Sequence, residues 1–243
     1  FQRRANIPDE GGLSNVLPYA NIGSMKSWGM DGTLAYTHTF NKDMALTVRG
    51  NFTHAENEVI YWEQSGVNYP YQSNSGVPYK VQRGLIALGL FKDEDDFKSS
   101  PKQTFMDNYR PGDIKYKDVN GDGKIDGDDQ YRQGSGGTPQ SNYGFNVDLE
   151  YKGWSLNMLW QGATNYNLYI DSILQGGNSN YLPVIYDFQK DIWAPDNTNS
   201  LYPRQHASAG FNGNNNFVSS NFWLVDAHYL RLKNLSISYD LKR

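Results

Sequence analysis

One stretch of the chain carries oxygen ligands at a spacing suited to a metal ion. Residues 118–129 read DVNGDGKIDGDD, with oxygen-bearing groups at the first, third, fifth, seventh, ninth and twelfth positions. A glycine stands at the sixth position, where such a loop must turn sharply. Calcium takes about six to eight oxygen ligands, and loops of this spacing wrap around it. The predicted ligands are Asp118, Asn120, Asp122, Lys124 through its carbonyl, Asp126 and Asp129.

This loop departs from the sensor type of calcium site in two ways. The twelfth position is Asp129 instead of glutamate, so bidentate binding requires the backbone to come closer to the ion. The flanking residues show no amphipathic helix pattern, which argues against a pair of calcium-sensing helices. We expect a structural Ca²⁺ ion that fixes a long loop, and an ion-free turn built on Asn-Gly and Asp-Gly is the alternative.

Catalytic chemistry finds little support in the residue pattern. The acidic run from Asp93 to Asp96 could supply the two carboxylates of a glycoside hydrolase, but adjacent acids in a polar segment usually form a solvated surface. The histidines at 38, 54, 206 and 228 lack metal-ligand spacing, and the absence of cysteine excludes disulfides and thiol catalysis. The chain is therefore predicted not to be an enzyme, with a secreted glycoside hydrolase as an alternative.

Aromatic side chains in two long polar segments are candidates for ligand contact. Aromatic residues make up 14% of the chain, and their rings can stack on sugars or on peptide side chains. The alternative is that these rings form small cores within the long segments. The candidates are Tyr61, Trp62, Tyr69, Tyr71 and Trp193, with Tyr79, Tyr202, Phe211 and Phe217 in the same two segments.

The elements that must position these groups are β-strands. Residues 145–151 and 154–160 alternate apolar and polar side chains on either side of a Lys152-Gly153 turn, which predicts a hairpin with one apolar face. No run of about 18 apolar residues occurs, which excludes a helical membrane protein. Strands are predicted near 28–40, 44–56, 142–151, 154–162 and 228–241.

The connections between these strands alternate strictly between short and long. Two are tight turns, whereas 57–141 and 163–227 are far longer than a hairpin loop. Outer-membrane barrels have short periplasmic turns and long extracellular loops, and a strand over 28–40 tilted by about 45° spans their apolar band of about 25 Å. The fold prediction is all-β, part of a large antiparallel transmembrane β-barrel whose apolar side chains face lipid and whose polar ones face the lumen.

A soluble protein remains the rival interpretation. The apolar faces could pack together in a sandwich, which would give a soluble, secreted, calcium-stabilised β-rich domain that binds glycans. Because five strands cannot close a barrel, the membrane interpretation requires the chain to be part of something larger. The net charge of −4 and the lack of a basic block argue against a nucleic-acid partner.

Four segments carry a family resemblance. PGDIKYKDVNGDGKIDGDDQ (111–130), YGFNVDLEYKGWSLNMLWQG (143–162) and VSSNFWLVDAHYLRLKNLSISYDL (218–241) follow one another as in SusC/RagA-like TonB-dependent outer-membrane transporters of Bacteroidetes. NIGSMKSWGMDGTLAYT (21–37) resembles the strand that precedes them. The resemblance is to the C-terminal barrel region, so the N-terminal extension, the TonB-interacting segment and the plug are expected to lie upstream.

This resemblance implies a function and a set of partners. Such a transporter imports oligosaccharides or oligopeptides across the bacterial outer membrane, driven through TonB, under the lid of a SusD-like surface lipoprotein. Lipid and lipopolysaccharide would surround the barrel. The polar side chains of the strands, Arg49, Asn51, Asp148, Glu150 and Asn157, are expected to meet the plug.

Overall fold

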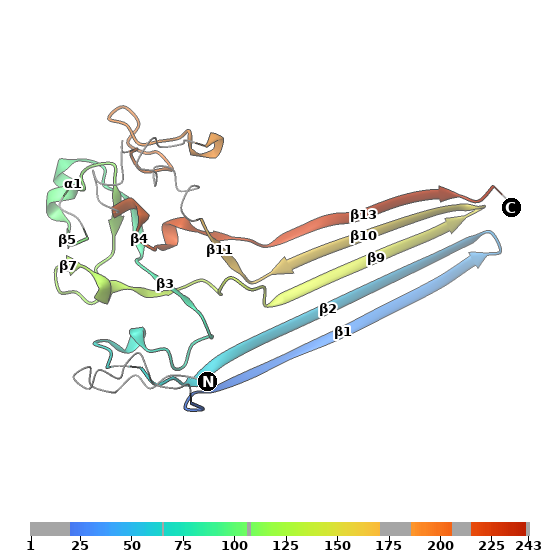
Figure 1. Ribbon diagram of the computed structural model, residues 1–243. Coiled ribbons are helices and arrows are strands. Elements are labelled where there is room, and N and C mark those ends of the chain that lie inside the picture. Colours follow the sequence, from blue (N-terminus) through green and yellow to red (C-terminus); the bar gives the residue numbers. More distant parts are fainter. Residues whose placement is uncertain (1–19, 65, 106–107, 171–185, 206–214, 242–243) are drawn as a thin grey trace.

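One long antiparallel sheet dominates the protein (Figure 1). The computed structural model describes residues 20–64, 66–105, 108–170, 186–205 and 215–241. The sheet has five strands in the order β1-β2-β9-β10-β13. They are β1 (Ser24–Asn41), β2 (Met44–Tyr61), β9 (Ser141–Tyr151), β10 (Trp154–Thr164) and β13 (Tyr229–Tyr239).

The two tight turns lie at the same end of the sheet. In the turn between β9 and β10, Lys152 and Gly153 have φ angles of 46° and 87°. Positive φ at both central residues matches the twist of the flanking strands, and it favours a residue such as glycine at the second place. The Lys152 amide donates to the Asp43 carbonyl of the neighbouring turn, at 2.8 Å. The two hairpins are therefore joined at their tips.

The two faces of the sheet differ in chemistry. Cross-strand neighbours on one face are apolar, as in the rows that join Leu46 to Leu149 and Leu149 to Leu156. Many of these side chains are exposed in the described chain, among them Leu34 at 78% and Ile237 at 65%. The opposite face is polar. There, Asn157 donates a hydrogen bond to Asn146 at 3.1 Å and a second one to Asp148.

A register shift keeps the last strand apolar on the correct side. Leu159 pairs with Asn234 and Trp160 with Leu232, so Lys233 is an extra residue in β13. Side chains alternate along a strand, and one inserted residue moves all that follow to the other face. Without the insertion, Leu232 and Leu235 would point to opposite faces. The bulge thus places both on the apolar face.

The long connections gather at the other end of the sheet, where they form a compact layer of their own (Figure 1). Their buried core contains Leu85, Ile114, Tyr116, Ile125 and Trp223, which come from both connections. The elements are β3 (Gln82–Gly84), β4 (Ala87–Leu90), α1 (Glu94–Ser99), β5 (Lys102–Gln103), β6 (Ile114–Tyr116), β7 (Lys124–Ile125), β8 (Tyr131–Gln133), β11 (Asn167–Tyr169) and β12 (Leu224–Asp226), with 3-10 turns at Pro70–Gln72, Gly127–Asp129, Asp187–Gln189, Asn215–Phe217 and Asn221–Trp223.

The all-β class is confirmed, and the described residues form an open sheet, not a closed barrel. Within the described residues, no helix has the length and apolar character to cross a membrane. The first hairpin is longer than expected, because β1 begins at Ser24 and β2 continues to Tyr61. At about 3.3 Å per residue, β1 is about 59 Å long. The first long connection consequently starts at residue 62 instead of 57.

Candidate functional site

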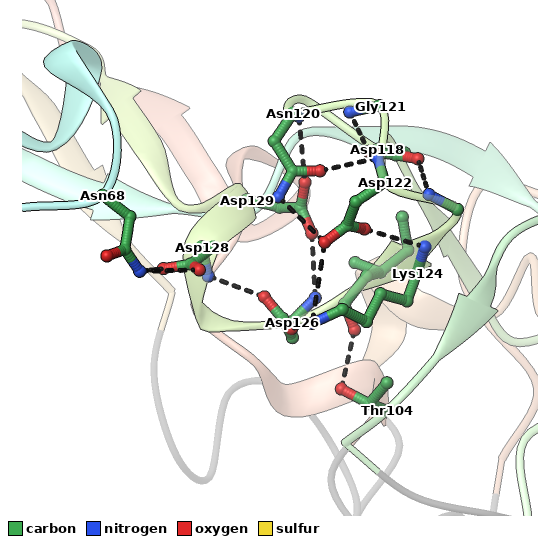
Figure 2. Close-up of polar contacts among 12 residues, drawn as sticks. Asn68, Thr104, Asp118, Asn120, Gly121, Asp122, Lys124, Asp126, Asp128 and Asp129 are labelled. Atoms are coloured by element: carbon green, nitrogen blue, oxygen red, sulfur yellow. Dashed lines mark hydrogen bonds and ion pairs between the residues drawn. The ribbon is translucent and has the colours of Figure 1, made fainter.

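The acidic loop is held in shape by its own carboxylates. Asp118 accepts hydrogen bonds from the amides of Gly121 and Gly123, at 2.6 and 2.8 Å. Gly123 has a φ of +85°, a left-handed conformation that glycine adopts at little cost, and it stands at the predicted sharp turn. These short-range bonds fold the polypeptide around the carboxylate of the first position (Figure 2).

Asp129 closes the loop from the other side. Its side chain is fully buried, and its two oxygens accept from the amides of Val119 at 2.7 Å and Asp126 at 2.8 Å. Three backbone groups share this carboxylate, since the amide of Asn120 also approaches it, at 3.4 Å. A buried carboxylate needs such donors. Asp129 therefore joins the beginning of the loop to its end.

The ammonium of Lys124 lies among the remaining acids. It forms ion pairs with Asp126 and, at 3.6 Å, with Asp122. The hydrogen bond from Lys124 and that from the Asp128 amide lower the pKa of Asp126. The bond to Asp126 and the nearby Asp122 raise the pKa of Lys124. The lysine thus supplies the positive charge that this group of carboxylates attracts.

The loop is attached to both of its neighbours. On one side Ile125 is buried, and its carbonyl accepts from the hydroxyl and the amide of Thr104, each at 2.9 Å. On the other side, Asp128 accepts from the amide groups of Asn68 and Gln72, both at 3.0 Å in their shortest contact. Figure 2 shows both attachments. The acidic loop therefore links two parts of the first long connection, the segment around Asn68 and the segment around Thr104.

The donor chemistry of the loop fits calcium, whereas the arrangement described here is not that of an assembled site. The predicted ligands offer hard oxygens at the required spacing. However, within the described residues no group of three or more histidine, cysteine, aspartate or glutamate side chains is arranged to hold a metal ion. The Lys124 ammonium would have to move away from Asp122 and Asp126 before a cation could share them.

The predicted ligand-contact aromatics fall in three places. Tyr69 and Tyr71 stack on each other, with ring centroids 5.4 Å apart, beside the acidic loop. Trp193 packs closely on Gly112, where an added Cβ would lie 2.4 Å from the indole ring, so its position is that of a packing residue. Tyr61 and Trp62 lie together at the end of β2.

Beside the end of β2 lies Tyr79, one of the further aromatic candidates in the first long segment. The rings of Trp62 and Tyr79 are 6.0 Å apart, and Tyr79 lines three neighbouring cavities. Its position follows from an isolated bridge between Val59 and Val77, which folds the chain back over the strand. No local pattern of residues predicts an isolated bridge between two segments of this kind.

The other candidates of the sequence lie elsewhere. Tyr202 and Phe217 belong to the second connection, and Tyr202 packs near the buried Trp223 with ring centroids 6.4 Å apart. His206 and Phe211 lie outside the described residues. In the acidic run, Asp93 caps helix α1 by accepting from the amides of Asp95 and Asp96. The run thus has a clear structural role as a helix cap.

Buried polar groups join the two long connections. The side chain of Asn216 accepts from the Ile114 amide at 2.9 Å and donates to Asp113 at 3.0 Å. Its carbonyl accepts from the indole of Trp223 at 2.6 Å. The side-chain amide of the neighbouring Asn215 donates a further hydrogen bond to the Ile114 carbonyl, at 3.0 Å. We call these contacts the loop clasp. They make the two connections one packed unit.

The chain is similar to parts of known receptors and transporters. No family model matches the chain. TonB-dependent receptor P3 of Formosa agariphila is 25% identical over 248 residues, which cover 97% of this chain and 23% of that receptor. TonB-dependent receptor SusC of Bacteroides thetaiotaomicron is 21% identical over 237 residues, 91% of this chain and 21% of SusC. The chain resembles part of a TonB-dependent receptor.

Solved structures support the same fold for this receptor-like segment. A chain of the RagAB peptide transporter superposes with a TM-score of 0.64 at 21% identity, covering 97% of this chain and 25% of that one. The 'open-open' state of the RagAB peptide importer gives a TM-score of 0.65. The predicted resemblance to SusC/RagA-like transporters is confirmed. The segment spans about a quarter of the length of the relatives it matches, and those relatives are receptors and transporters, not enzymes.

Proposed function

We propose that this chain is the C-terminal barrel segment of a TonB-dependent importer in the bacterial outer membrane. The observation that carries the proposal is the combination of one apolar and one polar sheet face with long connections at one end only. In a membrane barrel, lipid covers the outward apolar face and the inner face lines a polar interior. The exposed apolar side chains of the described sheet then contact lipid and lipopolysaccharide.

The proposed cargo is an oligosaccharide or an oligopeptide. The similarity to SusC and to the RagAB peptide transporter supports an import role of this kind. The tight turns then lie in the periplasm and the compact loop layer lies outside the cell. A SusD-like lipoprotein would sit over that layer as a lid, and TonB would act through the plug and the N-terminal region of the complete protein.

Fractionation of cells that make the complete protein tests the proposal. We expect the protein in the outer membrane, extractable only with detergent, and we expect its deletion to abolish uptake of its cargo. A protein that is released into the buffer by breaking the cells, without detergent, would contradict the membrane assignment. That result would favour the soluble, calcium-stabilised glycan-binding domain instead.

We also propose that the acidic loop binds one structural Ca²⁺ ion through Asp118, Asn120, Asp122, the Lys124 carbonyl, Asp126 and Asp129. The donor set supports this proposal, and so does the buried Asp129 that already draws the two ends of the loop together. The ion would replace the Lys124 ammonium as the partner of Asp122 and Asp126. Its role would be to stiffen the acidic loop and so to hold the two parts of the first long connection together.

Chelation provides a test that is independent of transport. In the detergent-solubilised complete protein, removal of calcium by EDTA should speed protease cleavage within residues 111–130, and added calcium should restore protection. The Asp118→Ala variant should be cleaved quickly with or without calcium. Cleavage that is slow and equal under all conditions in the unaltered protein would mean that the loop is an ion-free turn.

A further inference from the structure

Three neighbouring cavities surround Tyr79 at the loop end of the sheet. They have volumes of about 210, 320 and 410 Å³, and the Tyr79 side chain lines all of them. Residues of strands β1 and β2 form part of their lining, among them Met25, Ser27 and Val59. Ser27 and Asp31 stand at odd positions of β1, and Thr53 and Val59 stand at odd positions of β2. All four therefore point to the same, polar face of the sheet. The cavities therefore open on the polar side of the sheet.

Backbone hydrogen bonds fix the segment that carries Tyr79. The amide of Val59 donates to the Val77 carbonyl at 2.9 Å, and the Gly76 amide donates to the Val59 carbonyl at 2.7 Å. The amide of Tyr79 itself donates to the side chain of Asn57 at 2.7 Å. These bonds anchor the segment on strand β2 on both sides of Pro78. The cavity walls are thus formed before any ligand arrives.

The smallest cavity has the size and lining of a site for one side chain. Its walls include Val59, Val77, Val81 and the ring of Trp62. An apolar cavity of about 150 Å³ accommodates benzene, whereas sites for whole drug-sized ligands run from about 300 to 1,000 Å³. At about 210 Å³ the cavity suits a phenyl or branched aliphatic group. Asn74 and Lys80 are the polar members of its lining.

A positive charge stands at the edge of this cavity. Lys80 has a φ of +59°, in the left-handed region that non-glycine residues rarely adopt, and its ammonium lies 5.5 Å from the centre of the Tyr79 ring. The carboxylate of Glu56, whose residue also lines the third cavity, lies 3.3 Å from the imidazole of His54. No ion pair joins Lys80 to a carboxylate of the described residues, so its ammonium can pair with a carboxylate of the ligand.

We propose that this site binds the C-terminal residue of an oligopeptide. An apolar side chain fills the cavity that Val59, Val77 and Tyr79 line, and the terminal carboxylate pairs with Lys80. The inference rests on the proposed import function and narrows its cargo to peptides that end in an aromatic or branched aliphatic residue. An apolar pocket with one convergent charge is the arrangement that fixes both the identity and the direction of a ligand.

Binding of two matched probes to the complete purified transporter tests this proposal. The probes are tetraalanyl-phenylalanine with a free carboxylate and the same peptide as its terminal amide. In calorimetry the free acid should bind about tenfold more tightly, as expected for one charge-assisted hydrogen bond at a partly exposed site. The Lys80→Gln variant should remove that difference. The Lys42→Gln variant, altered in the tight turn at the far end of the sheet, should keep it.

The aromatic wall is tested in the same assay. Tyr79→Ala should weaken both probes, whereas Tyr79→Phe should preserve binding and so report a correctly folded site. Equal affinity for acid and amide in the unaltered protein, or no binding of either, would overturn the proposal. So would binding of a linear maltooligosaccharide that is lost in Tyr79→Ala. In each of these cases the outer-membrane location and TonB dependence of uptake remain separately measurable, so the import function stands or falls on its own.

Discussion

The phenol of Tyr71 donates a hydrogen bond of 2.6 Å to the backbone carbonyl of Asp128, 57 residues further along the chain. Asp128 lies in the acidic loop, and Tyr71 belongs to a short turn that stacks two tyrosine rings. This single contact therefore ties a candidate ligand-contact segment to a candidate metal loop. A change that moves the Asp128 carbonyl is therefore expected to move the Tyr71 ring and the Tyr69 ring stacked on it.

Removal of this hydrogen bond should loosen the stacked tyrosines from the acidic loop. Tyr71→Phe keeps the ring but leaves the Asp128 carbonyl with one partner fewer, a loss of about 1 kcal/mol. We expect faster hydrogen exchange over residues 68–73 and 126–131. Tyr69→Phe is the matched control, because it alters the stacked partner ring and leaves the Tyr71 hydrogen bond in place. Equal exchange in the two variants would show that the contact contributes nothing.

Ionisation of Tyr71 should mark the alkaline limit of the same contact. Burial, followed by the negative charge of Asp129, raises the pKa of Tyr71 from 10.0 to about 12. A raised pKa of this acid means that its stabilising contribution is complete below pH 10 and is lost as the pH rises from 10 to 12. The difference in tyrosinate absorbance between the unaltered protein and Tyr71→Phe should therefore titrate near 12. A difference that titrates near 10 would refute the coupling.

Opposite faces of strand β10 should respond differently to charge. Leu156 faces its apolar neighbours Leu149 and Ile237, whereas the adjacent Ser155 faces Glu150. Lysine on the lipid face costs about 2–4 kcal/mol at the middle of a membrane and about 0–1 kcal/mol near its interfaces, and Leu156 lies three residues after the β9–β10 turn, so an intermediate cost applies. Leu156→Lys should therefore reduce the amount of folded protein in the outer membrane, and Ser155→Lys should not. Electrophoretic mobility before and after heating measures the folded fraction.

The bulge in β13 supplies a sharper test of register. Deletion of Lys233 would force either the Leu230 and Leu232 side chains or the Leu235 and Ile237 side chains onto the polar face. We expect this deletion to abolish assembly, while Lys233→Ala, which keeps the residue count, should assemble normally. Normal assembly of the deletion variant would mean that the last strand tolerates a shifted register.

The loop clasp should control the cohesion of the loop layer. In Asn216→Leu the buried Ile114 amide loses its acceptor and Asp113 loses one of its donors, and each unsatisfied buried group costs about 1–3 kcal/mol. Protease cleavage should accelerate in both long connections at once. Asn108→Leu, at an exposed position, should leave cleavage unchanged. Faster cleavage in one connection alone would show that the two are not a unit.

The sequence pattern predicted the sheet well where one face is apolar and the other polar. The pattern did not predict where the first hairpin ends. Around Glu56 and Glu58 the strand β2 continues, but both of its faces are polar there and the apolar-polar alternation disappears. The bulge did leave a trace, because the leucines shift from even positions, 230 and 232, to an odd one at 235. A change of parity in an otherwise regular strand is the signal that would have revealed it.

The candidate sites were predictable in part. The spacing of the acidic loop is visible in the sequence, but the role of Asp128 is not, since its partners Asn68 and Gln72 lie about 60 residues away. The cavity at Tyr79 depends on the bridge between Val59 and Val77, and the strands of two or three residues in the loop layer depend on similar pairings. Contacts between distant segments decide such features, and local residue preferences do not record them.

The loop clasp also constrains the order in which the protein can mature. Ile114 and Asn216 are separated by 102 residues, with the β9–β10 hairpin between them. Closing so long a loop costs entropy, and the contact gains nothing until the strands between its two partners have brought them together. We therefore expect the loop layer to pack after the strands. Until it does, Leu85 and Trp223, which are buried in the packed layer, stay exposed to solvent. Chaperones and proteases recognise exposed apolar side chains of this kind, so they can act on the incompletely folded protein.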